Sequence, residues 1–344
     1  MKSIATYLEY TVEQQGSDLH LVGDEIPMIR VQGQLQNIEE KEISNKEFET
    51  QVEALLSADQ KKRFIEQKEL DMSYEHGGAR FRVNLHRQEG KVGLAARVIP
   101  KEIPSPDQLR LEAPLREFTN LLDGLVLVVG PTGHGKSTTI ASMIEEINKT
   151  RKAHIVTVED PIEFLFEDKE SLIVQREVGE DTYSFDAALK HVLRQDPNVI
   201  LVGEMRDPET IATVLTAAET GHLVFSTLHT STAAEAIERI VDVFDGAKQK
   251  QILIQLSAVL RGVVAQQLVP TVDGRRVAAR EILINTPAVA NLIRENNIAQ
   301  LPSVIQTGAK QGMIPMDKAI EALYKEELID KETAEKRSGR QRRI

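Results

Sequence analysis

Residues 130–137 carry the most specific chemistry in the sequence. They read GPTGHGKS and fit the pattern G-x-x-x-x-G-K-[ST] at every position. Glycines permit positive φ angles, so successive backbone N–H groups can converge on phosphate oxygens. Lys136 would reach the β- and γ-phosphates of a nucleotide, and the Ser137 hydroxyl would ligate Mg²⁺. The stretch therefore predicts a P-loop, a phosphate-binding loop for a nucleotide and its metal ion.

The flanks of this P-loop support the same prediction. An apolar, largely β-branched run predicts a strand at 125–129, and a helix is predicted to begin at Lys136. The N-terminus of that helix adds partial positive charge near the bound phosphates. A chance match in a glycine-rich turn would lack both flanks. The expected nucleotide-binding residues are Gly130, Pro131, Thr132, Gly133, His134, Gly135, Lys136, Ser137 and Thr138.

Acidic residues after two other predicted strands could complete the site. A P-loop needs a carboxylate on a neighbouring strand to hold Mg²⁺ or the attacking water. Glu204 follows the strand predicted at 199–202, where sheets of this kind form a ligand-binding crevice. Glu159, Asp160 and Glu163 follow another strand, and a proline stiffens their turn. Either set could instead consist of solvated loop carboxylates.

Two histidines flank a third predicted strand, at 223–227. His222 precedes this strand, and His229 follows it just before a helix that Ser231 or Thr232 would cap. His229 could hydrogen-bond the γ-phosphate and report its loss, although a single histidine is often only structural.

Composition narrows the class of protein. Of 344 residues, 41% are hydrophobic and 28% charged, as in ordinary globular proteins. A net charge of −11 and an aromatic content of 4% without Trp argue against nucleic acid as a partner. The absence of Cys excludes disulfides, thiol catalysis and cysteine-bound zinc. The N-terminal residues predict an amphipathic helix and no signal peptide, and no apolar run approaches the roughly 18 residues of a membrane helix.

The elements that would position these residues fall into two regions. Residues 1–100 predict a small α/β domain, in which the last two strands alternate arginines with apolar residues. Three prolines at 100–106 make 101–113 the expected linker and hinge. The elements expected before the linker are helices at 4–14 and 45–67, a hairpin at 27–35, and strands at 79–88 and 91–100.

Residues 114–344 predict a second, larger domain. Short apolar strands between helices indicate a buried sheet of parallel strands. Beyond residue 247 the pattern is mostly helical, apart from a strand at 275–284. The polar end at 335–344 predicts either a disordered basic tail or an electrostatic dock for an acidic partner. The remaining strands are expected at 125–129, 154–158, 172–175, 199–202 and 223–227, with helices beginning at Lys136, Ser184, Pro208 and Thr232.

Several motifs together resemble those of the secretion and pilus ATPases, most closely the type IV pilus retraction ATPases, the PilT group. TVEDPIE at 157–163 is similar to the family's Asp box, ILVGEMRD at 200–207 to its variant Walker B motif, and AAETGHLVFSTLHT at 217–230 to its His box. The resemblance covers nearly the whole chain in the family's order. Further similar segments are SDLHL at 17–21, RFRVN at 80–84, ARVIP at 96–100 and IQTGAKQGM at 305–313.

The resemblance implies an α/β fold of two domains and a homohexamer with ATP at domain and subunit interfaces. Residues 1–100 would form a PAS-like domain. Residues 114–344 would form a RecA-like P-loop ATPase domain with a helical C-terminal region and a basic tail.

The resemblance also implies residue roles. Lys136 and Ser137 would hold ATP and Mg²⁺. Glu204 would support the metal or polarise water, and Glu163 would be its companion and a candidate base, two roles that the sequence leaves unassigned. His229 would sense the γ-phosphate. Arg82 and Arg97, with Arg80 as a further candidate, would approach the phosphates as arginine fingers. Residue types alone leave these arginines as a solvated strand face.

The implied function is an ATP-hydrolysing motor that disassembles type IV pili for twitching motility. Such a motor is cytoplasmic, lies at the inner face of the membrane through an inner-membrane platform protein, and can work with a paralogous pilus ATPase. The lack of Cys favours the retraction branch, because related elongation and export ATPases commonly carry a four-cysteine zinc module.

One departure from the family pattern bears on the retraction role: AVANLIRE at 288–295 has Ala290 where the usual AIRNLIRE has arginine. His134 stands where serine is usual, but this position is free in the P-loop pattern, so ATP binding should survive. The alternatives within the family are a PilU-like accessory ATPase and a pilus extension or type II secretion ATPase. Two further alternatives are a non-hydrolysing regulatory subunit and a RecA-like motor that is stimulated by nucleic acid.

Overall fold

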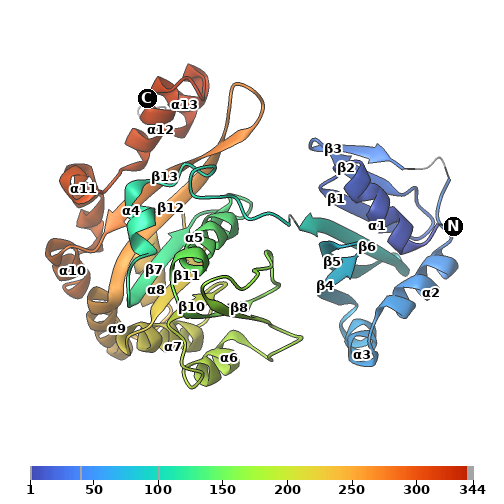
Figure 1. The fold of residues 1–344 in the computed structure, drawn as a ribbon, viewed down its shortest axis with the longest axis horizontal. Coiled ribbons are helices and arrows are strands. Elements are labelled where there is room, and N and C mark those ends of the chain that lie inside the picture. Colours follow the sequence, from blue (N-terminus) through green and yellow to red (C-terminus); the bar gives the residue numbers. More distant parts are fainter. Residues whose placement is uncertain (1, 39–40, 100, 339–344) are drawn as a thin grey trace. The chain divides into compact units, whose positions relative to one another are not determined.

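The computed structural model describes residues 2–38, 41–99 and 101–338. The chain forms two compact units (Figure 1). The first contains Met1–Glu102 and the segment Pro161–Leu165, and the second contains Ile103–Asp160 and Phe166–Ile344. The segment that bears Glu163 is thus grouped with the first unit.

The first unit is a six-stranded antiparallel sheet in the order β3-β2-β1-β6-β5-β4, with three helices packed on one face. Its core joins apolar residues of the helices to alternate residues of the strands. Its elements are α1 (Ile4–Glu13), β1 (Asp18–Val22), β2 (Met28–Val31), β3 (Gln34–Asn37), α2 (Asn45–Leu55), α3 (Ala58–Gln67), β4 (Glu69–His76), β5 (Ala79–Gln88) and β6 (Lys91–Ile99).

The alternation of β5 sets a polar face on this sheet. Phe81, Val83 and Leu85 are buried in the core. Because successive side chains of a strand point to opposite faces, Arg82 lies on the other side. Its cross-strand partner on β6 is Arg97. The predicted strand pair with arginines on one face is therefore confirmed.

One helix prediction for the first unit is wrong. The span 45–67 holds two helices, because Ser57 begins a new one. The Ser57 hydroxyl accepts a hydrogen bond from the Gln60 N–H, and the Gln60 side chain accepts one from the Ser57 N–H. This capping box satisfies backbone donors at the start of α3 and ends the preceding segment. The edge strand β4 was not predicted from the sequence.

The second unit contains a seven-stranded sheet in the order β13-β12-β7-β11-β10-β8-β9. All neighbouring strands run parallel except β12 and β13. The predicted parallel sheet is therefore confirmed. Its strands are β7 (Gly124–Val129), β8 (His154–Glu159), β9 (Leu172–Glu177), β10 (Val199–Val202), β11 (Leu223–Leu228), β12 (Leu260–Pro270) and β13 (Arg276–Ile284).

Helices cover both faces of this sheet (Figure 1). Val126 and Val128 of β7 pack on the face covered by α4 and α5. Leu125 and Leu127 pack on the opposite face, with α6 to α11. The helices are α4 (Ala113–Phe118), α5 (Lys136–Thr150), α6 (Phe185–Val192), α7 (Pro208–Glu219), α8 (Ala233–Asp242), α9 (Gly246–Val259), α10 (Pro287–Arg294), α11 (Leu301–Thr307), α12 (Met316–Lys325) and α13 (Lys331–Arg337), with 3₁₀ turns η1 (Ile298–Gln300) and η2 (Ala309–Gln311).

Strand β12 is the largest difference between the sequence prediction and the structure. The chain beyond residue 247 was expected to be helical up to the strand at 275–284, yet β12 runs parallel to β7 and extends the sheet. Most of its residues are buried. A strand buried on both faces lacks the period-two alternation that reveals a half-exposed strand.

The basic end is partly helical. Lys336 and Arg337 belong to α13, so the expectation of a disordered tail is wrong for these two residues. Arg340, Arg342 and Arg343 lie outside the described residues. Within 2–38, 41–99 and 101–338, no helix is long and apolar enough to cross a membrane.

Candidate nucleotide site

The P-loop leaves β7 and enters α5 as its sequence predicts. Gly130 has φ 149°, and a Cβ atom there would lie 2.3 Å from the Gln266 carbonyl oxygen. Gly135 caps α5 in the left-handed region, with φ 77°. Both positions therefore require glycine. The helix that starts at Lys136 directs its first free N–H groups and its positive dipole end toward the loop.

The ammonium group of Lys136 is held inside the P-loop. The residue is 7% exposed. Its Nζ donates hydrogen bonds to the carbonyl oxygens of Gly130 at 2.7 Å and Pro131 at 3.1 Å. This buried, hydrogen-bonded cation is positioned to attract phosphate.

Glu204 and His229 come together at the same edge of the sheet as the P-loop. Glu204 follows β10 and is 8% exposed, and His229 follows the neighbouring β11. The His229 Nε2 atom lies 3.2 Å from Glu204 Oε2, and its Nδ1 atom lies 3.3 Å from Thr132 Oγ1 of the P-loop. Carboxyl ends of parallel strands share one edge, which explains the meeting.

Arg206 adds a cation to this cluster. Its Nε atom lies 2.5 Å from Glu204 Oε1. The carboxylate thus faces Arg206 through one oxygen and His229 through the other. Arg206 was not singled out from the sequence, although it lies within the GEMRD stretch after β10.

His222 has a different role from His229. It stands before β11, at the opposite end of that strand, and its Nδ1 atom lies 2.9 Å from the Ala217 carbonyl oxygen. This contact fastens the end of α7 to the start of β11. His222 is therefore a structural residue.

The acidic residues at and after the end of β8 lie in two environments. Glu159 is buried, and its Oε1 accepts hydrogen bonds from Thr157 at 2.6 Å and Gln175 at 3.3 Å. These bonds fix its carboxylate inside the second unit. Glu163 is half-buried in the segment grouped with the first unit.

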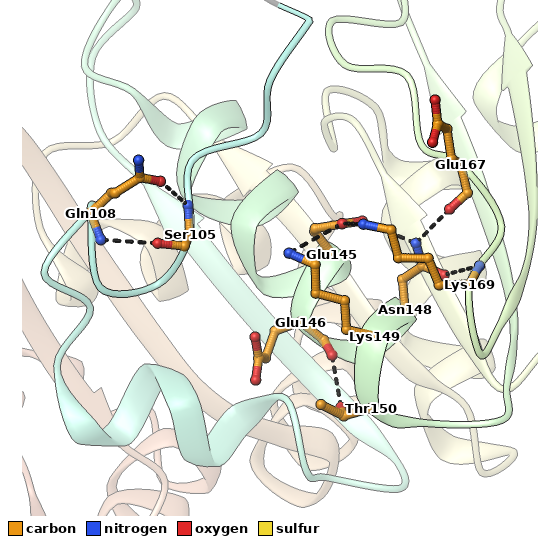
Figure 2. Close-up of polar contacts among 9 residues, drawn as sticks. All are labelled: Ser105, Gln108, Glu145, Glu146, Asn148, Lys149, Thr150, Glu167 and Lys169. Carbon is orange, nitrogen blue, oxygen red and sulfur yellow. Dashed lines mark hydrogen bonds and ion pairs between the residues drawn. The ribbon is translucent and has the colours of Figure 1, made fainter.

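A polar cluster joins the loop that follows Leu165 to α5 within the second unit (Figure 2). Asn148 Nδ2 donates to Glu145 Oε2 at 3.0 Å and to the Glu167 carbonyl at 2.8 Å, while Lys169 pairs with Glu145. Burial by itself raises the pKa of Glu145, but the hydrogen bonds from Lys169 and Asn148 outweigh it and hold that pKa below its ordinary value. The loop after Leu165 is therefore tied to the helix that follows the P-loop.

The arginines expected to act as fingers lie in the first unit. Arg97 donates from Nε to Asp18 Oδ1 at 2.8 Å, and its side chain is 68% exposed. Arg80 pairs with Glu75 at 2.8 Å. Arg82 lies half-buried between them on the same face. The guanidinium groups of Arg82 and Arg97 thus share one surface of the first sheet.

The polar groups near the P-loop fit a magnesium ion that arrives with a nucleotide. Among the residues that the structure describes, no group of three or more His, Cys, Asp or Glu side chains could hold a metal. Mg²⁺ commonly takes one or two protein oxygens and completes its shell with phosphates and water. The Ser137 hydroxyl, in the first turn of α5, and the Glu204 carboxylate are oxygen ligands of that kind.

Two buried residues near the P-loop were not predicted from the sequence. Gln266 of β12 and Arg280 of β13 are 2% and 1% exposed. They escaped notice because β12 was not predicted. One sequence signal could have pointed to Gln266: the pair Gln266–Gln267 stands inside an otherwise apolar run.

The P-loop connects a strand of a parallel sheet to a helix, and an acidic residue and a histidine lie at the same edge of that sheet. This arrangement is typical of a nucleotide-binding site. The chain belongs to the family described as "Type II/IV secretion system protein", which matches residues 1–340. The resemblance inferred from the motifs is confirmed by this match.

Particular relatives agree with the family assignment. The chain is 45% identical to the type IV pilus retraction ATPase PilT of Pseudomonas aeruginosa, over 97% of this chain and 98% of that protein. It is 39% identical to the type IV pilus ATPase PilU of the same organism, over 95% of this chain and 86% of that protein. A crystal structure of the pilus retraction motor PilT with bound ADP superposes with a TM-score of 0.90 at 43% identity, covering 98% of this chain and 97% of that one.

Proposed function

We propose that this protein is a hexameric ATPase that powers type IV pilus retraction, the disassembly of pilin that drives twitching motility. The observation that carries the proposal is the cluster of Thr132, Glu204 and His229 around the P-loop. The names of the two relatives and the ADP in the PilT crystal structure support it. The higher identity to the retraction ATPase than to PilU favours a motor over an accessory subunit.

Within the second unit, each residue has a proposed task. The P-loop amides, Lys136 and Thr138 bind the phosphates of ATP. Ser137 and Glu204 offer oxygens to Mg²⁺, which neutralises phosphate charge when bound. Glu204, held between Arg206 and His229, orients the attacking water. His229 contacts both Glu204 and the P-loop, so it is suited to sense the γ-phosphate.

The first unit supplies the remaining groups in this proposal. Arg82 and Arg97 approach the phosphates as arginine fingers, and Glu163 acts as a companion carboxylate and candidate base. ATP would bridge the P-loop of one subunit and arginines of a mobile N-terminal domain. Loss of the γ-phosphate would weaken that attachment, and segment 101–113 is the proposed hinge.

The proposed setting is the cytoplasm, at the inner face of the membrane. The chain would reach the membrane through a platform protein of the pilus machine and could act with a paralogous pilus ATPase. The net charge of −11 provides no general attraction for nucleic acid, so none is proposed as a partner.

ATP turnover by the purified protein tests the enzymatic part of the proposal. Wild type should hydrolyse ATP in the presence of Mg²⁺, and Lys136→Ala should abolish turnover because the phosphates lose their buried cation. Turnover that rises on addition of DNA or RNA would favour a nucleic-acid motor. Turnover in Lys136→Ala equal to wild type would refute the P-loop assignment, and nucleotide binding without turnover in wild type would indicate a regulatory subunit.

A further inference from the structure

Gln266 of β12 is a buried amide that joins three parts of the second unit. Its Oε1 accepts hydrogen bonds from Thr139 Oγ1 of α5 at 2.8 Å and from Arg280 Nε at 2.7 Å. Its Nε2 donates to the His134 carbonyl oxygen at 2.8 Å. One side chain therefore holds both the P-loop and the helix that follows it.

A second contact fixes the same part of the P-loop to β12. The Leu268 N–H donates to His134 Nδ1 at 3.2 Å. His134 is thus attached to β12 through its backbone, by Gln266, and through its ring. The P-loop is therefore attached to β12 at two points.

Arg280 continues the chain of contacts away from the P-loop. It faces Gln266 across the β12–β13 pair. Its Nη1 lies 3.1 Å from Glu112 Oε2, and its Nη2 donates to the Leu109 carbonyl at 3.2 Å. The guanidinium thus divides its donors between Gln266 and residues 103–112, which we call the connecting segment.

The connecting segment is an ordered piece of chain that directly follows the first unit in sequence. Ser105 and Gln108 exchange hydrogen bonds at 2.7 and 3.2 Å (Figure 2), which fixes a turn. The Leu111 N–H donates to the Pro106 carbonyl at 2.9 Å. Leu111 packs in the core of the second unit, and the buried side chain of Arg280 joins the segment to the β12–β13 pair.

We propose that Arg280 and Gln266 form a relay through which the position of the connecting segment sets the affinity of the P-loop for nucleotide. They are positioning residues. The proposal rests on the proposed function in one respect, that the P-loop binds nucleotide. If the connecting segment shifts, Arg280 must follow Glu112 or leave a buried charge unpaired, which is strongly unfavourable. Gln266 must then reorient, and His134 and Thr139 lose a shared partner.

The test alters the connecting segment by mutation and measures nucleotide binding at the P-loop. Glu112→Gln weakens the ion pair with Arg280 without touching the P-loop. Its dissociation constant for a fluorescent ADP analogue should change by roughly two- to thirtyfold, the range found for mutations that alter coupling between sites. Gln266→Met should also alter this constant. In the Gln266→Met background, Glu112→Gln should then have no further effect.

Two control variants separate the relay from simple loss of stability. Asp107→Asn lies in the same connecting segment but weakens a 2.7 Å bond from Arg116, and it leaves the contacts of Arg280 in place. Asn285→Leu removes an amide that holds the carbonyls of Ser257 and Leu260, in the same unit. Both should lower the melting temperature or leave it unchanged, with ADP affinity as in wild type.

The outcomes test the relay and the proposed function separately. If Glu112→Gln changes ADP affinity equally in both backgrounds, or leaves it unchanged, the relay is refuted. It is also refuted if Asn285→Leu and Gln266→Met shift affinity alike. Wild type that binds ADP but does not turn over ATP would refute the proposed function alone, because the ADP titration still decides the relay. Wild type that binds no ADP would refute both.

Discussion

The Nε2 atom of His229 lies 3.2 Å from Oε2 of Glu204, across the ends of two neighbouring parallel strands. The same imidazole reaches Thr132 of the P-loop through its other nitrogen. His229 therefore connects the carboxylate proposed to orient water with the loop proposed to bind phosphate. A change in phosphate occupancy at the P-loop can reach Glu204 through a single side chain.

Glutamine in place of His229 should lower kcat for ATP by about 10²-fold, the loss expected when one preorganised hydrogen-bond donor is removed from a site of developing charge. The affinity for ADP should stay close to that of wild type, because ADP lacks the γ-phosphate. Steady-state kinetics and ADP titration measure both. His222→Gln is the matched control, since His222 lies at the other end of β11 and should leave kcat unchanged. Equal losses in both variants would contradict a catalytic role for His229.

Alanine in place of Arg82 should reduce kcat by about 10³-fold or more, the effect of losing an arginine finger. The melting temperature should change little, because the side chain lies on the polar face of the first sheet. Arg87→Ala is the control on the same strand, where the side chain pairs with Glu49 at 2.6 Å. A kcat for Arg82→Ala within twofold of wild type would show that Arg82 does not act at the nucleotide site.

His134 should make stability depend on pH. Burial, followed by the charges of Arg337, Lys136 and Arg276, lowers the pKa of His134 below its ordinary value of 6.5. The unfolded chain then binds a proton more readily than the folded protein. The stabilisation present above pH 6.5 is therefore lost as the pH falls from 6.5 toward the folded-state pKa.

Thermal melts between about pH 8 and about pH 5.5 test this effect against His134→Ser. The variant should lose less stability on acidification than wild type, because the Leu268 N–H no longer depends on a neutral ring. If wild type and variant lose stability in parallel, the acid sensitivity comes from other groups.

Ala290→Arg tests whether the departure in the C-terminal motif matters. Ala290 is half-buried on α10, next to the buried Val289. Arginine there should change the free energy of unfolding by about 1 kcal/mol or less, because its long side chain can carry the charge from a half-buried position to solvent. In a deletion strain, the native chain and Ala290→Arg should both restore twitching. Restoration by Ala290→Arg alone would show that the native chain is not the retraction motor.

The P-loop and the strands around it were predictable because their signals are local. Gly130 and Gly135 mark backbone that only glycine adopts easily, and the apolar run before them has the length of a strand. Glu204 and His229 were found from a general rule, since carboxyl ends of parallel strands share one edge. The contacts of His229 with Glu204 and Thr132 depend on the folded arrangement of the strands and leave no signal in the sequence.

The residues that were missed depend on long-range pairing. Arg280 and Gln266 meet only because β13 pairs with β12, and β12 is a strand only because it pairs with β7. No local pattern predicts those pairings. Likewise, the break at Ser57 rests on a single reciprocal pair of hydrogen bonds inside a stretch of helix-forming residues.

The central claim is tested most directly by the number of surface pili on a strain that lacks this gene. If the protein retracts pili through ATP hydrolysis, deletion should give excess surface pili without twitching. Wild type should reverse this phenotype on complementation, and Lys136→Ala should not. Counting pili by electron microscopy gives the result. Cells without pili after deletion would contradict retraction and indicate an extension motor, and an unchanged pilus count with normal twitching would contradict any essential motor role.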